Sequence, residues 1–217
     1  MNPEAETPLR SPRASSKREL TKAQNRGLIL DAARRVFAEL GYGAATVRDI
    51  IGATSLASGT FYNYFKSKEE VFQALRDESA LAVRPRLREA RRKATTAEEF
   101  VAATFRTFFE FSARERKGEG TNDKAFPRMR LDTPQVVAGF VELREDIELA
   151  IAAGLLPALD AGYLAASIIG VAFEMAEEMM SRPPPPDIEG ATVFATQLIM
   201  TGLSSPVYGG GVERPRP

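Results

Sequence analysis

Residues 46–72 read TVRDIIGATSLASGTFYNYFKSKEEVF, a stretch in which two short helical segments flank a tight turn. Thr46 and Asp49 have the spacing of a capping box, which predicts the start of the first short helix. Phe61 and Phe65 lie one helical turn apart in the second segment, so both are expected to point inward. A very short helix, a tight turn and a second short helix are typical of a helix-turn-helix motif.

The second short segment surrounds its two phenylalanines with small, polar and aromatic residues. Small residues leave room for base edges in a DNA groove, hydroxyl and amide groups can hydrogen-bond to them, and tyrosines can contact phosphates or thymine methyl groups. One tyrosine alone would more simply be a packing residue, but two of them flank an asparagine here, which favours a DNA-reading surface. The residues concerned are Ser58, Gly59, Thr60, Tyr62, Asn63 and Tyr64.

The other long segments have the 3.6-residue periodicity of α-helices, with almost no signal for strands. Apolar residues from Ile29 to Leu40 form one helical stripe, and Gly41 is expected to stop that helix. Pro85 is expected to kink or split the long helix that follows the motif. Further helices are predicted over 68–93, 96–116, 133–153, 162–181 and 188–203.

We therefore predict an all-α protein with an N-terminal three-helix helix-turn-helix domain and a C-terminal helical domain. Proline, serine and basic residues near the start favour a disordered basic arm, and glycines and prolines at the other end favour a flexible tail. The predicted ranges are 1–20 for the arm, 21–67 for the helix-turn-helix domain, 68–205 for the C-terminal domain and 206–217 for the tail.

Composition excludes the commonest kinds of catalytic site. The 217 residues include no His and no Cys, which removes Ser-His-Asp triads, thiolate zinc sites, iron–sulfur clusters and cysteine nucleophiles. We therefore expect no enzyme activity, no metal site and no cofactor. Lys+Arg and Asp+Glu are equal at 29 each, yet residues 1–68 carry 11 basic against 6 acidic side chains. This asymmetry suits a nucleic-acid-binding module joined to another domain, although a solvated basic arm would give the same count.

The motif and its surroundings resemble the N-terminal DNA-binding domain of the TetR family of bacterial transcriptional regulators. The resemblance covers about 45 residues and rests on Arg34–Phe37, Gly41–Tyr42, Thr46–Ile50 and the stretch GTFYNYFKSKEEVF at 59–72. It implies an Ω-shaped homodimer with about nine helices per subunit, in which the first three helices bind DNA. The remaining helices would hold an inducer pocket and the dimer interface.

The resemblance also implies which residues contact DNA. Arg48 occupies the position of the family's base-contacting arginine, and Thr46 is expected to reach a phosphate. The base-reading positions of the recognition helix are occupied by Ser58, Gly59, Thr60 and Tyr62. The phosphate-contacting positions are occupied by Asn63, Tyr64 and Lys68.

This chain departs from the family pattern at the start of the recognition helix. The family usually has Gly at the position of Ser55 and Ser at that of Ala57, and losing a serine cap typically costs about 1 kcal/mol. Ser55 or Ser58 could cap the helix instead and shift its start. Because the family often has Lys at the Ser58 position, the basic arm at Arg13–Lys22 is expected to compensate by entering the minor groove.

Two C-terminal helices, 162–181 and 188–203, are apolar around most of their circumference and must be covered on several sides. Burial inside one subunit would achieve this. Two such helices at the end of a small domain, together with the resemblance, favour a four-helix homodimer interface, which small residues would allow to pack closely. These small residues are Ala165, Ala166 and Gly170.

Aromatic and methionine side chains of the C-terminal domain could line an apolar ligand pocket, although core packing explains most of them equally well. Arg106 and Glu174 are charged residues amid apolar neighbours and are the candidate polar anchors, with surface exposure as the simpler alternative. The candidate ligand-binding residues are Phe105, Arg106, Phe108, Phe109, Met129, Glu174, Met175 and Met179.

The sequence thus predicts a cytoplasmic, ligand-responsive transcriptional repressor. Its expected partners are double-stranded DNA with a palindromic operator, a small apolar or aromatic inducer, and a second copy of the chain. No secretory signal or membrane-spanning stretch is recognised, so no membrane partner is expected. The alternative is an all-helical small-molecule-binding or scaffold protein with a non-functional helix-turn-helix.

Overall fold

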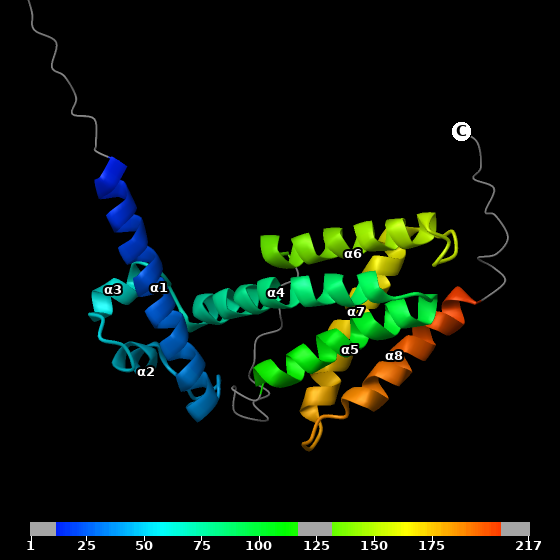
Figure 1. Ribbon diagram of the computed structural model, residues 1–217. Coiled ribbons are helices and arrows are strands. Elements are labelled where there is room, and N and C mark those ends of the chain that lie inside the picture. The colour runs from blue at the N-terminus through cyan, green and yellow to red at the C-terminus, as the bar shows by residue number, and fades with distance from the viewer. Residues whose placement is uncertain (1–11, 117–131, 205–217) are drawn as a thin grey trace, which may run out of the picture.

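The computed structural model describes residues 12–116 and 132–204, and every regular element in these ranges is an α-helix. Figure 1 shows α1–α3 at one end of the molecule and α5–α8 at the other, with α4 joining them. The predicted all-α fold, a helix-turn-helix followed by a helical body, is confirmed. The described ranges hold eight helices, where about nine were expected: α1 (Pro12–Leu40), α2 (Val47–Gly52), α3 (Ser58–Tyr62), α4 (Lys68–Lys93), α5 (Ala97–Arg116), α6 (Pro134–Ala152), α7 (Ala161–Ser181) and α8 (Ile188–Leu203).

Helix α1 begins earlier than the sequence pattern predicts. It starts at Pro12, so residues 12–20, which were expected to be part of a disordered arm, are helical. A proline is tolerated in the first turn because its missing N–H has no intrahelical partner there, and no proline or glycine interrupts the helix before Gly27. Residues 1–11 of the predicted arm and the predicted tail, 206–217, lie outside the described residues.

The first hydrophobic core joins α1, α2, α3 and the first two turns of α4. The predicted stripe of α1 is buried in it, except for Leu40, which is 50% exposed. Gly41 follows with a φ of 76° and ends the helix as predicted. Phe72 and Leu75 of α4 also belong to this core. The domain boundary predicted at residue 67 is therefore too early, because α4 packs into the first core as far as Leu75.

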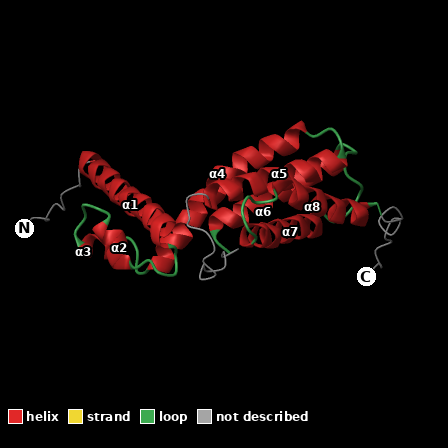
Figure 2. Cartoon of the chain, turned by 90° about the horizontal axis from the view of Figure 1, so that it is seen from below, coloured by secondary structure: helices red, strands yellow, loops and turns green. Residues whose placement is uncertain are grey.

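The second core lies between α5, α6, α7 and α8, at the other end of the elongated molecule seen in Figure 2. Pro85 is exposed on α4 and does not split the helix, because buried Val83 and Arg91 anchor it on either side. Within residues 12–116 and 132–204, none of the helices combines the length and apolar character that crossing a membrane requires.

Candidate nucleic-acid interface and ligand cavity

Thr46 and Asp49 form the predicted capping box at the start of α2. Thr46 Oγ1 accepts a hydrogen bond from the Asp49 N–H at 3.2 Å, and Asp49 Oδ2 accepts one from the Thr46 N–H at 2.9 Å. The Thr46 hydroxyl also donates to this carboxylate, at 2.6 Å. Thr46 is exposed, but its hydroxyl is already engaged in the cap. Arg48, the second residue of α2, is exposed.

Helix α3 is anchored from behind and presents its other face to solvent. Phe61 and Phe65 are only 1% and 5% exposed, as predicted, whereas Tyr62 between them is 58% exposed. A Cβ added at Gly59 would meet no atom within 4 Å, so the folded chain itself does not need glycine there. Glycine would be needed at this position if a partner approached the backbone closely, because a side chain would then be in the way. The other exposed members of this face are Ser58 and Asn63.

The start of α3 is where this chain departs from the family pattern. The helix begins at Ser58, and its N-cap residue, Ala57, makes no side-chain hydrogen bond. The alternative caps considered for Ser55 and Ser58 therefore do not shift the helix. Burial of Phe61 in the first core fixes the position of α3 in place of a cap.

Two of the predicted contact residues near α3 are only partly available to a partner. Thr60 is half-buried on the side of α3 that faces the first core. Tyr64 is also half-buried and packs against that core, while its hydroxyl accepts a hydrogen bond from the Asn25 side chain of α1 at 3.3 Å. Tyr64 therefore ties α1 to the end of the recognition helix, a role that its position in the motif did not reveal.

Lys68, which is predicted to contact a phosphate, binds backbone oxygens of the folded chain. Its Nζ donates to the backbone oxygens of Tyr42 at 2.8 Å and Ala45 at 2.9 Å, with that of Gly43 at 3.4 Å. The ammonium group also lies 4.4 Å from the centre of the Tyr42 ring. Its three N–H groups thus point at the loop between α1 and α2. This geometry gives Lys68 a structural role in closing the loop.

A cavity of about 450 Å³ lies between α4, α5, α6 and α7. Its size and its mainly aromatic and aliphatic wall are typical of small-molecule sites. Much of the apolar wall comes from Val83, Leu87, Phe108, Phe111, Phe140, Leu143, Ile168 and Phe173.

Two arginines at the cavity wall, Arg84 and Arg91, are paired with carboxylates of α6. Arg91 Nη2 lies 2.6 Å from Asp146 Oδ2, and both residues are buried, at 5% and 7% exposure. Arg84 binds Glu142 through two hydrogen bonds and holds the pKa of that carboxyl group below its usual range. Burial lowers the pKa of Arg91, whereas Asp146 opposes that shift and keeps the guanidinium charged. An anionic ligand would therefore have to displace a carboxylate to use either guanidinium.

The predicted ligand-binding residues divide between the cavity, the core and the surface. Phe108 and Glu174 line the cavity. Arg106 does not, because it pairs with Glu189 of α8 on the protein surface. Met129 lies outside the described residues. The residues that instead pack in the second core are Phe105, Phe109, Met175 and Met179.

Sequence reasoning missed the two ion pairs at the cavity, of which only Arg91–Asp146 is buried. Arg84 and Arg91 are two turns apart on α4, and Glu142 and Asp146 are one turn apart on α6, so each pair of like charges follows one helix face. That spacing was the available signal. It does not show that the two faces meet, because the helices are about 55 residues apart along the chain.

The pKa shifts predict how stability depends on pH. Side-chain hydrogen bonds hold the pKa of Asp49, Glu69, Glu99 and Glu142 below their usual values, so the folded chain binds fewer protons than the unfolded chain in acid. The free energy of unfolding should be full above about pH 5.5 and fall as pH drops through about 4. Since the chain has no His, urea titrations should give nearly equal values at about pH 6 and 8. A clear decline between those two values would contradict this assignment.

A short α2, a tight turn and an α3 with a buried aromatic anchor and a polar outer face define a helix-turn-helix motif, the motif of a class of DNA-binding domains. Residues 29–75 match the family described as bacterial regulatory proteins, tetR family. The helix-turn-helix end of this chain therefore matches that family, as its motif predicted. The matched range ends at Leu75, where the first core also ends.

Comparison with individual proteins supports both halves of the fold. The chain is 45% identical over 53 residues to the HTH-type transcriptional repressor Rv1474c of Mycobacterium tuberculosis; this match covers 24% of the chain and 28% of that relative's length. It is 25% identical over 190 residues to the HTH-type transcriptional activator FasR of Mycolicibacterium smegmatis, covering 85% of each. The solved structure of the fatty acid degradation regulator FadR from Bacillus halodurans has a TM-score of 0.63 and 26% identity, over 83% of this chain and 96% of that one. These relatives are named as regulators, not enzymes.

Proposed function

We propose that this chain is a homodimeric transcriptional repressor that reads a palindromic operator through α3 and is released by a small apolar or aromatic molecule. The outer face of α3 carries this proposal. Tyr62 is exposed beside a glycine with open space in front of it, although Phe61 and Phe65 hold the helix firmly from behind. Exposure of a large aromatic side chain on a well-anchored helix suits a groove-reading role.

Arg48 supplies the sharpest test of DNA reading. In fluorescence anisotropy titrations with the duplex upstream of the protein's own gene, Arg48→Ala should weaken binding by about 1–3 kcal/mol and relax specificity at one base pair. The reason is that an arginine reading a base edge contributes discrimination as well as affinity. Arg144→Ala, which removes an exposed arginine of α6, is the matched control and should leave both unchanged.

Two outcomes would change the proposal. An equal loss on all duplexes from Arg48→Ala would make Arg48 a phosphate contact. A wild-type chain that binds small molecules but no duplex at low ionic strength would instead be an all-helical ligand-binding protein with a non-functional helix-turn-helix.

The proposed homodimer uses the outward faces of α7 and α8. Tyr163, Phe194 and Leu198 are 79%, 61% and 52% exposed in the single chain. Single exposed apolar residues are ordinary on a protein surface, but several large ones together mark an interaction surface. Of the small residues expected at the interface, Ala166 and Gly170 face outward, whereas Ala165 is buried inside the subunit and cannot contribute. A second copy related by a two-fold axis would cover this face.

The proposed inducer site is the cavity beside α4. The pairing of Arg84 and Arg91 with carboxylates and the aromatic wall favour an apolar or aromatic molecule over an anion. A differential affinity for the two states of about 1–3 kcal/mol would release DNA by a factor of about 5–150. Mass spectrometry of molecules that co-purify with the protein would identify candidates, each of which should lower operator affinity when added back. A reporter gene behind the operator tests whether the chain represses or activates transcription, since Rv1474c is named a repressor and FasR an activator.

A further inference from the structure

Helix α4 belongs to both halves of the molecule. Its residues from Val71 to Leu75 are buried in the first core, and Val83 is buried at the cavity. Between these anchors, no residue from 76 to 82 is buried. Polar contacts made by this segment therefore matter for the direction in which α1–α3 are held against the body.

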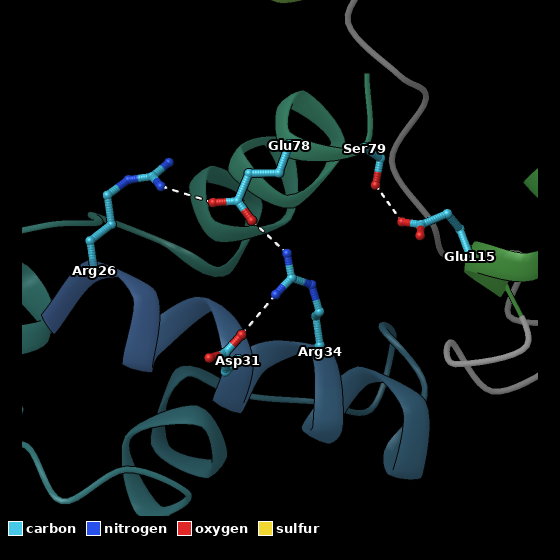
Figure 3. Close-up of polar contacts among 6 residues, drawn as sticks. All are labelled: Arg26, Asp31, Arg34, Glu78, Ser79 and Glu115. Atoms are coloured by element: carbon cyan, nitrogen blue, oxygen red, sulfur yellow. Dashed lines mark hydrogen bonds and ion pairs between the residues drawn. The ribbon is translucent and has the colours of Figure 1, made fainter. Parts of the chain in front are cut away.

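Glu78 makes the principal polar contact from this segment to the DNA-binding end. Its Oε1 lies 3.1 Å from Arg26 Nη1, and its Oε2 lies 2.5 Å from Arg34 Nη2, as Figure 3 shows. Arg34 is held in place from its other side by Asp31, at 2.8 Å. Arg26 and Arg34 are about 12 Å apart along α1, since each residue of a helix rises by about 1.5 Å. One carboxylate thus fixes α1 at two points, which sets its direction as well as its position.

The next residue, Ser79, faces the ligand-binding body. Its hydroxyl donates to Glu115 Oε2 of α5 at 2.5 Å, and both residues line the cavity. Ser79 shares the cavity wall with Ala80 and Val83 of the same helix. A molecule that displaces this face of α4 must also displace Glu78, because the two residues share one helical turn.

We propose that Glu78 is a positioning residue that couples the cavity to the DNA-binding domain by holding α1 at a fixed angle to α4. This inference rests on the proposed function and names the contact through which it is regulated. Exposed ion pairs contribute little to folding stability, and those of Glu78 are of this kind, with side-chain exposures of 36–50%. We expect these ion pairs to act on the angle between α1 and α4, because a contact at two points restricts the rotation of one helix against the other.

The first test measures the angle directly, with no DNA or ligand present. The chain has no Cys, so A44C and E98C place two spin labels at exposed positions, one at each end of the molecule. Electron–electron resonance on labelled chains diluted with unlabelled protein reports their distance distribution. E78Q should broaden this distribution and shift its mean, with a melting temperature close to that of the parent. E89Q removes an exposed glutamate that pairs only within α4 among the described residues, and it should change neither.

The second test fills part of the cavity in place of a ligand. A Cβ at Gly139, on the cavity wall, would meet only Arg84 Cγ at 4.0 Å, so the leucine side chain of G139L has room to fill part of the cavity. G139L should shift the label distance in the chain that keeps Glu78. In the E78Q background, the same substitution should shift the distance by less than half as much. If G139L does not fold, A80V takes its place in the same cycle.

Each result decides the proposal. An unchanged distribution in E78Q, or equal shifts from the cavity substitution in both backgrounds, would overturn it, as would the absence of any shift. Because these measurements need no DNA, their failure is distinct from a failure of the proposed function, which a lack of operator binding by the wild-type chain would show.

Discussion

Replacing Asp146 by alanine is expected to lower the free energy of unfolding by about 3–5 kcal/mol, as measured by urea denaturation. Asp146 is the carboxylate that faces the buried Arg91, and its oxygen accepts from two guanidinium nitrogens at 2.6 and 2.8 Å. Removing it leaves a charged group only 5% exposed without its counter-ion. The pair also joins α4 to α6 beside the cavity, so the loss should loosen the wall that would hold a ligand.

The same helix provides the control. Glu148 pairs with Arg144 one turn away on the surface of α6, and Glu148→Ala should cost no more than about 0.5 kcal/mol. Replacing both members of the buried pair, as R91M with D146L, should be less harmful than D146A alone because no unpaired charge remains. An Asp146→Ala chain within about 1 kcal/mol of wild type would mean that water reaches Arg91 and that the pair is not truly buried.

The parts of the fold that the sequence predicted are those specified by neighbouring residues. The capping box of Thr46 and Asp49, the stop at Gly41 and the inward pair of Phe61 and Phe65 each depend on residues within a few positions of one another. Local backbone geometry and helical periodicity determine such features directly. They sufficed for the all-α fold and for the outward face of α3.

The features that the sequence does not predict depend on contacts between distant residues. Lys68 follows the motif in sequence, but the loop between α1 and α2, more than twenty residues away, attracts its ammonium group. Leu75 extends the first core beyond the predicted boundary because α4 is shared by both cores. The early start of α1 at Pro12 has a different cause: the prolines, serines and basic residues near the start favour disorder, but a proline is tolerated in the first turn of a helix.

The residues that line the cavity are also not predictable from local sequence. Phe105, Phe108 and Phe109 are adjacent on α5 and equally apolar, but only Phe108 faces the cavity. Periodicity shows that a helix has an apolar side and does not show whether that side meets another helix or an opening between helices. The surface position of Arg106 depends on its pairing with Glu189, which lies 83 residues later in the chain, so local sequence does not reveal it.

Leu198→Glu is expected to convert the proposed dimer into monomers and to lower operator affinity by about 100-fold or more. Leu198 and Phe194 are one turn apart on the outward face of α8, so a glutamate there would place a charge in the covered interface. A dimer engages two half-sites at once, and losing the second removes an avidity of about 10²–10⁴. Sedimentation velocity gives the oligomeric state, and anisotropy with the full palindromic duplex gives the affinity.

Val141→Glu is the matched control, since Val141 is 50% exposed in the single chain but lies on α6, away from this face. It should remain dimeric and bind the operator as the wild type does. Because Leu198 is already 52% exposed, the glutamate should leave the fold of the subunit intact, and an unchanged helical circular dichroism spectrum would show this. A Leu198→Glu chain that stays dimeric would place the interface elsewhere. A monomeric chain that keeps full operator affinity would show that DNA binding does not depend on pairing, and the two-half-site arrangement would then be wrong.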